Sequence, residues 1–290
     1  MCLSPPHTRP QLATMFTVRF SSVCYAFQRN YWRKLWPFRR GRGLPARLAK
    51  RLTTRPLWVE LQRGVMMQLD PRNMISRVLL ETREWEPDTW RAIASHLGPG
   101  STFVDVGAHF GHCSLMAARV VGPNGRVIAI EGNPRTVKQL RDNVWASGAR
   151  VNVQSAVCSS SEKFVDFFIS SGTNRAKNSI SRANASVAEG SASSDHIKAY
   201  PLDSILSQLR ISRVDVLKID VEGAELEVLR GAKDTLTRHR PVLIIELEEE
   251  LLANMGTSSS EVHHLLATYG YGSDGVFDDA NNRFIALDSR

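Results

Sequence analysis

Apolar and polar positions alternate regularly between short and long segments from about residue 64 to the end of the chain. The short apolar runs have the length of buried strands, and the longer segments place apolar residues on one face of a helix. The expected strands cover residues 65–69, 103–106, 126–131, 151–155, 164–169, 214–219 and 242–245. The expected helices cover residues 87–97, 113–121, 134–146, 202–209, 221–232 and 260–269. Strands that alternate with helices predict an α/β fold with a mostly parallel sheet.

Two segments depart from this alternation. Residues 170–195 are rich in Ser, Asn and Gly with few apolar residues, so we expect a long loop of the kind that commonly covers a binding site. Short strand-like segments at 270–277 and 283–287 follow the last helix directly, and they predict a C-terminal antiparallel hairpin.

Residues 1–63 are basic and lack the pattern. They hold 13 of the 37 Lys and Arg residues and a single acid, Glu60, for a charge of +12, whereas residues 64–290 hold 24 basic and 28 acidic residues, or −4. We therefore divide the chain into a poorly ordered basic N-terminal extension, residues 1–63, and a domain, residues 64–290. Because aromatic residues are interleaved with the arginines, three interpretations are open: a solvated tail, a contact with an anionic membrane surface or nucleic acid, or an organelle transit peptide.

The four cysteines, Cys2, Cys24, Cys113 and Cys158, are widely spaced and form no CxxC pair. This usage fits a reducing compartment and argues against a cysteine-bound zinc. No run approaches the roughly 18–20 apolar residues of a membrane span. We expect a cytoplasmic protein that could touch a membrane surface through its basic extension.

Acidic residues stand at or beside the carboxyl ends of four expected strands: Asp105, Glu131, Asp220 and Glu246. Ligands of open α/β sheets bind at these ends, so the four carboxylates should meet in one pocket. Such a pocket is unfavourable without a cationic ligand or a metal, which favours the sulfonium of S-adenosylmethionine over the pyrophosphate of a dinucleotide. The alternative is that each acid is the N-cap of the next helix.

A glycine turn follows the strand at 103–106. Gly107 and Gly111 should let the backbone approach a ligand, and Glu131 at the end of the next strand can accept both ribose hydroxyls. The spacing Gly107-x-x-x-Gly111 differs from the Gly-x-Gly-x-x-Gly that an NAD-dependent oxidoreductase would need. The sequence therefore predicts a nucleoside site suited to S-adenosylmethionine.

Motifs in the order of Rossmann-like methyltransferases occur at residues 105–111 (DVGAHFG), 131–134 (EGNP) and 140–144 (LRDNV). Together with residues 216–225 (VLKIDVEGAE) and 228–232 (VLRGA), they resemble the FkbM-type S-adenosylmethionine-dependent methyltransferases over roughly residues 65–285. The resemblance implies a doubly wound, seven-stranded sheet and methylation of a hydroxyl on a sugar, glycolipid or secondary-metabolite acceptor.

The same resemblance implies the roles of individual residues. The cofactor-binding positions would be Asp105, Gly107, Ala108, His109, Gly111, Glu131, Asn133, Ser155 and Ala156, with the last two near the adenine. The catalytic positions, at the reaction end, would be Asp220 and Glu222. His109 stands where Asn is more usual in the family, and Gly132-Asn133-Pro134 replaces a more common Pro-x-Pro, but neither departure removes a required charge or turn.

Methyl transfer to an alcohol requires alignment of the reactants and removal of the hydroxyl proton. Asp220 is our first candidate for the base or for orienting the acceptor, and Glu222 is the second. Asp220 and Glu246 could instead hold Mg²⁺, the ion that suits oxygen ligands, although we assign no metal. We interpret His109 and His112 as a loop residue and a helix residue rather than metal ligands.

Two other functions compete with this reading. A nucleic-acid methyltransferase could use the basic extension, but the acidic segment 220–223 would repel a phosphate backbone. A non-catalytic cofactor-binding adaptor is the second alternative, and the retained acids argue against it because a purely structural fold needs no acidic pocket.

Overall fold

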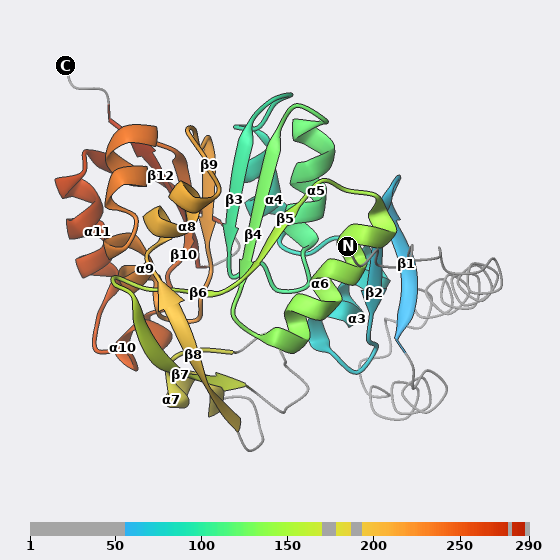
Figure 1. Cartoon of the computed structure of the whole chain (residues 1–290), viewed down its shortest axis with the longest axis horizontal. Coiled ribbons are helices and arrows are strands. Elements are labelled where there is room, and N and C mark those ends of the chain that lie inside the picture. Colours follow the sequence, from blue (N-terminus) through green and yellow to red (C-terminus); the bar gives the residue numbers. More distant parts are fainter. Residues whose placement is uncertain (1–55, 170–177, 187–192, 278–279, 288–290) are drawn as a thin grey trace, which may run out of the picture.

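A seven-stranded sheet forms the centre of the protein, in a computed structural model that describes residues 56–169, 178–186, 193–277 and 280–287 (Figure 1). Its strand order is β11-β12-β10-β9-β3-β4-β5. The strands are β3 (Thr102–Val106), β4 (Arg126–Glu131), β5 (Asn152–Ser155), β9 (Val216–Ile219), β10 (Val242–Glu246), β11 (Tyr271–Phe277) and β12 (Asn281–Ala286). The five strands from β10 to β5 run parallel, and β12 and β11 add an antiparallel hairpin at one edge. The predicted α/β fold, its sheet and its C-terminal hairpin are confirmed.

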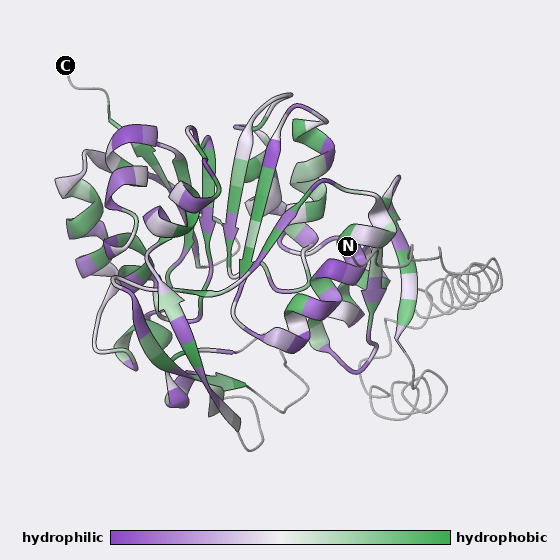
Figure 2. Cartoon of the chain, in the orientation of Figure 1, coloured by the Kyte–Doolittle hydropathy of each residue, from purple (hydrophilic) through white to green (hydrophobic). Residues whose placement is uncertain are grey.

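Helices cover both faces of this sheet because its strands are apolar on both sides. One face carries α4 (Pro87–Ala94), α5 (His112–Val121) and α6 (Pro134–Ser147). The other carries α8 (Leu202–Gln208), α9 (Glu225–Arg230), a π-helical turn η1 (Thr235–His239) and α11 (Ser259–Thr268), with α10 (Glu249–Ala253) nearby. Every residue of β3 is buried, and apolar residues concentrate along the central strands in Figure 2.

The folded part begins before the predicted boundary at residue 64. Strand β1 (Leu57–Gln62) pairs antiparallel with β2 (Val65–Leu69), and helix α3 (Met74–Thr82) follows. The β2 backbone is tied to α6, where Ser147 Oγ and Asn143 Oδ1 accept N–H bonds at 2.9 and 2.8 Å. The sequence analysis places residues 57–62 in the extension because the regular pattern begins at about residue 64, whereas in the structure they form a paired strand. The rest of the extension, residues 1–55, lies outside the described residues.

A small three-stranded sheet borders the expected loop at 170–195 and includes its last three residues, 193–195. Its order is β6-β8-β7, formed by β6 (Val157–Cys158), β8 (Ser193–Tyr200) and β7 (Lys163–Ile169), and a short helix α7 (Arg182–Ser186) follows β7. The sequence did not reveal β8 because most of its side chains are polar and partly or fully exposed, while backbone pairing to β7 holds it. Residues 170–177 and 187–192 of the expected loop lie outside the described residues.

Within the described parts of the chain, none of the helices combines the length and apolar character needed to cross a membrane.

Candidate active site

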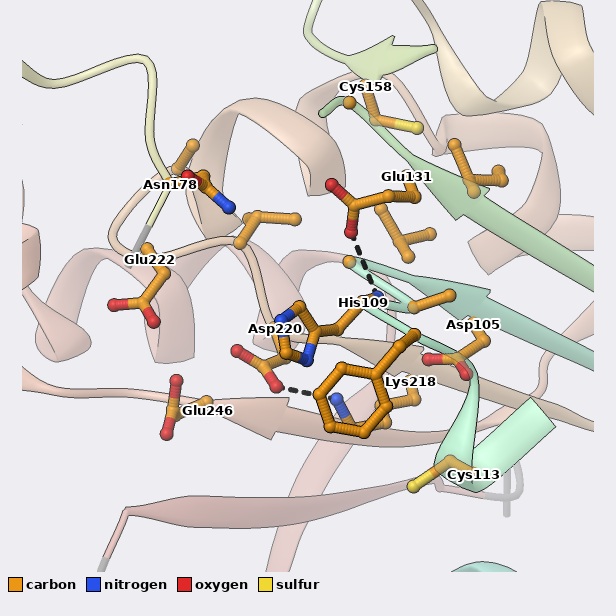
Figure 3. Close-up of a pocket in the computed structure, with 18 of the residues that line it drawn as sticks. Asp105, His109, Cys113, Glu131, Cys158, Asn178, Lys218, Asp220, Glu222 and Glu246 are labelled. Carbon is orange, nitrogen blue, oxygen red and sulfur yellow. Dashed lines mark hydrogen bonds and ion pairs between the residues drawn. The ribbon is translucent and has the colours of Figure 1, made fainter. Parts of the chain in front are cut away.

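A cavity of about 260 Å³ lies at the carboxyl ends of β3, β4, β9 and β10 (Figure 3). All four acids predicted to meet there, Asp105, Glu131, Asp220 and Glu246, line it. None of them is the N-cap residue of a described helix, because Gly111 precedes α5, Asn133 precedes α6, Ala224 precedes α9 and Glu248 precedes α10. The capping alternative is therefore wrong for these acids, and the pocket is the feature that they share.

The turn after β3 needs glycine for packing within the protein. Gly107 has φ +83°, and a Cβ built there would lie 1.7 Å from the carbonyl oxygen of Asp220. At Gly111, with φ +91°, a Cβ would lie 2.3 Å from Leu140 Cδ1. Protein atoms therefore occupy the side-chain position of both glycines, so packing within the protein requires glycine here in addition to any approach of the backbone to a ligand. Gly107 and the adjacent Ala108 line the cavity, whereas Gly111 does not.

Glu131 is held in a fixed orientation at the end of β4. Its Oε2 accepts the backbone N–H of His109 at 2.9 Å, and its Oε1 accepts the backbone N–H of Asn133 at 2.8 Å. Burial raises the pKa of Glu131 to about 7, and the two N–H bonds oppose this rise by stabilising the ionised form. Each carboxylate oxygen keeps a lone pair that can accept a further hydrogen bond.

Asn133 does not line the cavity, but it helps to orient Glu131. Its side chain caps α6 by accepting the N–H of Arg135 at 2.9 Å, and its own N–H fixes Glu131. The two predicted adenine residues differ in position: Ala156 lines the cavity, whereas Ser155 is exposed and does not. The apolar wall beside Glu131 is completed by Cys158 and Phe167, which contact the cavity from the smaller sheet.

A buried lysine that the sequence analysis missed lies among the acids. Lys218 stands opposite Asp105 in the pairing of β9 with β3, and its Nζ lies 2.7 Å from Asp220 Oδ2. Its side chain is only 6% exposed. Burial alone would lower the pKa of Lys218, but Asp220 and Asp105 raise it well above its ordinary value, so it is charged. A lysine two residues before an acid in an otherwise apolar strand was the available signal.

The acids around Lys218 differ in their surroundings. Asp105 Oδ2 accepts the Ser114 hydroxyl at 2.6 Å, and Oδ1 is buried with no hydrogen-bond partner among the described residues. Burial alone would raise the pKa of Asp220, but Lys218 and a hydrogen bond from Glu246 lower it below its ordinary value. Repulsion from Asp220, together with burial, raises the pKa of Glu246 to about 11, so Glu246 carries the proton.

Lys218 changes the charge argument made from the sequence. Four carboxylates in one pocket need an offsetting positive charge, and among the described lining residues Lys218 supplies one ammonium group. The carboxyl side chains that line the cavity still outnumber it, at Glu86, Asp105, Glu131, Asp220, Glu222, Glu246 and Glu248. The cavity therefore still favours a cationic ligand, but less strongly than four unpaired carboxylates would.

Glu222, the second predicted catalytic residue, lies on a turn beyond β9 and lines the cavity. Its φ is +56°, and its carbonyl oxygen accepts the Ser179 hydroxyl at 2.9 Å and Asn184 Nδ2 at 2.8 Å. Buried Glu225 braces the same turn through Oε1, which accepts the N–H groups of Val221 and Gly223 at 3.1 Å each. Glu225 is thus a structural residue of the VEGAE motif, and the turn is tied to Ser179 and to Asn184 of α7.

Two histidines also line the cavity. His109 adopts a left-handed conformation with φ +49°, and His112 begins α5. Burial lowers the pKa of each to about 4, so both imidazoles are neutral at pH 7. Among the residues that the structure describes, no group of three or more His, Cys, Asp or Glu side chains is arranged to hold a metal ion.

These features together define the class of the protein. A parallel sheet with a glycine turn after β3, a fixed acid at the end of β4 and an acid-lined cavity between them is the arrangement of a Rossmann-like S-adenosylmethionine-dependent methyltransferase. The family model described as the methyltransferase FkbM domain matches residues 105–272. Because this match covers more than half of the chain, the protein belongs to the FkbM methyltransferase family.

Individual relatives are distant. The 2-O-methyltransferase NoeI of Sinorhizobium fredii is 24% identical over 165 residues, which cover 53% of this chain and 66% of NoeI. The AMB antimetabolite synthetase AmbE of Pseudomonas aeruginosa is 25% identical over 205 residues, which are 60% of this chain and only 10% of AmbE. The crystal structure of an FkbM methyltransferase from Methylobacillus flagellatus is similar with a TM-score of 0.41 and 20% identity, over 72% of this chain and 52% of that one. The chain therefore spans less than two thirds of each of these relatives.

Proposed function

We propose that the protein transfers the methyl group of S-adenosylmethionine to a hydroxyl oxygen of a sugar, glycolipid or secondary-metabolite acceptor. The observation that carries the proposal is Glu131, whose two oxygens are fixed by the N–H groups of His109 and Asn133 beside the cavity. A carboxylate in this setting suits a pair of ribose hydroxyls. The distant relative NoeI is a 2-O-methyltransferase, which supports oxygen as the acceptor atom.

Two features of the cavity besides Glu131 support this cofactor. The apolar wall at Ala156, Cys158 and Phe167 offers a surface for adenine next to Glu131. Asp105 Oδ1, which has no hydrogen-bond partner among the described residues, offers an acceptor to the ammonium group of the amino-acid portion. S-adenosylmethionine supplies a methyl group that is activated by attachment to a positively charged sulfur.

Asp220 is the residue best placed to accept a hydrogen bond from the acceptor hydroxyl. Its ion pair with Lys218 fixes the carboxylate and lowers its pKa, which makes it a weak proton acceptor but a well-oriented hydrogen-bond acceptor. We therefore assign Asp220 to orienting the hydroxyl, with Glu222 as the second candidate for contact with the acceptor. Alignment of this kind is a large part of what an enzyme contributes to a displacement reaction.

The acidic lining also bears on the kind of acceptor. Among the cavity-lining residues that the structure describes, a phosphate group would meet several carboxylates and one lysine, which is already paired with Asp220. An uncharged polyol can donate hydrogen bonds to the same carboxylates without repulsion. We therefore favour an uncharged or cationic acceptor over nucleic acid, and the basic extension remains a candidate contact with an anionic membrane that carries a glycolipid acceptor.

A panel of methyl acceptors tests the proposal. The full-length protein is incubated with S-adenosylmethionine and, separately, neutral glycans, glycolipids, macrolide alcohols, sugar phosphates, DNA and RNA, and S-adenosylhomocysteine formation is measured. We expect turnover with a hydroxyl acceptor from the uncharged groups, strong loss in Asp220→Asn, and no loss in Asp142→Asn, a control at an exposed ion pair on α6. Turnover with nucleic acid alone would instead establish the competing function.

A further inference from the structure

A second, smaller cavity of about 60 Å³ lies beside the main one. Its lining comes from three segments of the chain: the end of β1, the stretch from Arg83 into α4, and α5. Trp85 and His112 line both cavities, so these two side chains form the wall between them. At roughly 10–15 Å³ for each water position, the side cavity has room for about five waters, or for part of one sugar ring. A ligand in the main cavity can therefore extend past Trp85 into it.

The lining of the side cavity combines two indole rings with planar polar side chains. Trp85 and Trp90 are partly buried, and both pack against the apolar core that includes α3 and α5. Gln62 and Arg91 add hydrogen-bonding groups to the same lining. An aromatic wall with a few polar groups is typical of a small-ligand site. A sugar ring suits this lining, because it presents an apolar C–H face to an indole and hydroxyl groups to the polar side chains.

His112 gives an independent indication of a ligand at this wall. The residue is 8% exposed, and its Nδ1 is buried with no hydrogen-bond partner in the part of the chain that the structure describes. Buried polar groups are nearly always hydrogen-bonded, so this nitrogen indicates a partner that the described residues do not supply. Because burial lowers the pKa of His112 to about 4, its ring is neutral and has one donor and one acceptor. A hydroxyl group suits either tautomer, since it both donates and accepts.

The charges around the side cavity favour an uncharged ligand. The guanidinium group of Arg91 is paired with Asp88, and Arg83 donates to the Glu60 carbonyl at 3.3 Å. Glu84 adds a carboxylate to the lining. Both arginines are therefore engaged by protein groups, and an acidic ligand would also meet a carboxylate.

The side cavity lies on the opposite face of the sheet from the wall proposed for adenine. Trp85 packs with α5 on one face, whereas Cys158 of the adenine wall packs with α8 and α9 on the other. Glu86, the residue after Trp85, lines the main cavity together with Asp220 and is near enough to Lys218 to interact with it electrostatically. An acceptor whose hydroxyl lies at Asp220 can therefore place its neighbouring unit against Trp85.

We propose that the side cavity behind Trp85 is an acceptor subsite for a second, uncharged sugar unit, so that the protein methylates acceptors of two or more linked sugars in preference to monosaccharides. The unit with the reacting hydroxyl lies at Asp220, and the next unit stacks on Trp85 and hydrogen-bonds to His112 and Gln62. In the transfer, the hydroxyl oxygen bonds to the methyl carbon, the sulfur keeps the electron pair of the broken bond, and the hydroxyl proton is released. This inference rests on the proposed function.

Methyl-transfer kinetics with matched saccharides test the inference. The full-length protein and S-adenosylmethionine are supplied with glucose, galactose, mannose or N-acetylglucosamine, or with their α- and β-linked disaccharides and trisaccharides, and S-adenosylhomocysteine formation is measured. We expect kcat/KM to rise at least about tenfold from a monosaccharide to its disaccharide in at least one series, mainly through a lower KM.

The outcomes separate the inference from the proposed function. Equal kcat/KM for both lengths in every series, or no turnover with any saccharide, would overturn the inference. Turnover with another hydroxyl acceptor in that case would leave the proposed function intact. Absence of S-adenosylmethionine binding in an isothermal titration would overturn the proposed function itself.

Variants connect the preference to the side cavity. Trp85→Ala should lower the disaccharide-to-monosaccharide ratio of kcat/KM to about one, whereas Trp85→Phe, which keeps an aromatic wall, should retain part of the preference. Gln62→Ala changes an exposed side chain that lines the side cavity and not the main one, and it should lower the ratio about threefold without unfolding the domain. Trp145→Ala, at an indole of α6 that is 50% exposed, is the matched control and should keep the wild-type ratio. A wild-type ratio in both Trp85→Ala and Gln62→Ala would overturn the assignment of the subsite.

Discussion

Gly107 offers the sharpest test of how the fold positions the active site. In Gly107→Ala, the new Cβ would lie 1.7 Å from the Asp220 carbonyl oxygen and 2.8 Å from its carbonyl carbon. The two backbone segments would have to separate by more than about 1 Å before the contact became tolerable. They are tied by hydrogen bonds from Gly107 N–H to the Ile130 carbonyl at 2.9 Å and from Asp220 N–H to the Val106 carbonyl at 3.0 Å, so this separation would strain the ends of three strands.

The cost of this substitution has two parts. A side chain at φ +83° costs roughly 1–2 kcal/mol, and overpacking adds roughly 1–3 kcal/mol or more. Gly148→Ala is a matched control, because Gly148 also has a positive φ, +58°, and a Cβ there meets no atom within 4 Å. We expect losses of unfolding free energy of roughly 3 kcal/mol or more at Gly107 and about 1 kcal/mol at Gly148.

Thermal and urea denaturation measure this difference. At roughly 2–4 °C per kcal/mol, Gly107→Ala should lower the Tm by about 6 °C or more, and Gly148→Ala by a few degrees. Because the contact is with Asp220, the Gly107 variant should also lose binding or turnover at temperatures where it is still folded. Equal destabilisation by the two substitutions would refute the argument that the Asp220 backbone is what requires glycine at Gly107.

Three further predictions follow from other parts of the structure. Burial raises the pKa of Glu131 to about 7, so Glu131 should be ionised above pH 7 and protonated below it. The affinity for S-adenosylmethionine should therefore be full above pH 7 and fall about tenfold per pH unit below it. Titrations of Glu131→Gln at the same pH values should lack this dependence. Asn184→Ala should lower the free energy of unfolding, measured by urea denaturation, by roughly 2–3 kcal/mol, because the carbonyls of Glu222 and Leu251 each lose the Asn184 side-chain donor. Asn124→Ala, at an exposed position, should lower it by less than about 0.5 kcal/mol. Full-length protein should pellet with anionic vesicles and a variant that lacks residues 1–55 should not; pelleting of both, or of neither, would remove the membrane proposal for that segment.

The sheet and the acids at the carboxyl ends of its strands could be predicted from the sequence, because both follow from simple patterns. A buried parallel strand is a nearly continuous apolar run, and an acid at its end interrupts that run visibly, as at Asp105 and Glu131. The same patterns could not identify β8, because most of its side chains are polar and backbone pairing with β7 holds it. Strand β1 does bury Val59 and Leu61, but it lies on the extension side of the boundary that the pattern set at residue 64.

The roles of Lys218 and the turn glycines required the three-dimensional arrangement. A lysine in a strand usually indicates an edge or a solvated face, and only the pairing of β9 with β3 places Lys218 opposite Asp105. The spacing of Gly107 and Gly111 predicts a turn that approaches a ligand. The atoms that a Cβ at these positions would meet belong to residues distant in sequence, Asp220 and Leu140. Contacts of this kind depend on tertiary packing, so local spacing alone does not specify them.

Titration of S-adenosylmethionine into the wild-type protein and Glu131→Gln at pH 8 tests the central claim most directly. The account predicts micromolar binding by the wild type and at least about tenfold weaker binding by Glu131→Gln, because the new amide presents an N–H group where two N–H donors and the ribose hydroxyls need acceptors. Glu162→Gln, which changes an exposed side chain paired with Lys198, should bind like the wild type. No binding by the wild type, or equal binding by all three proteins, would contradict a cofactor site organised around Glu131.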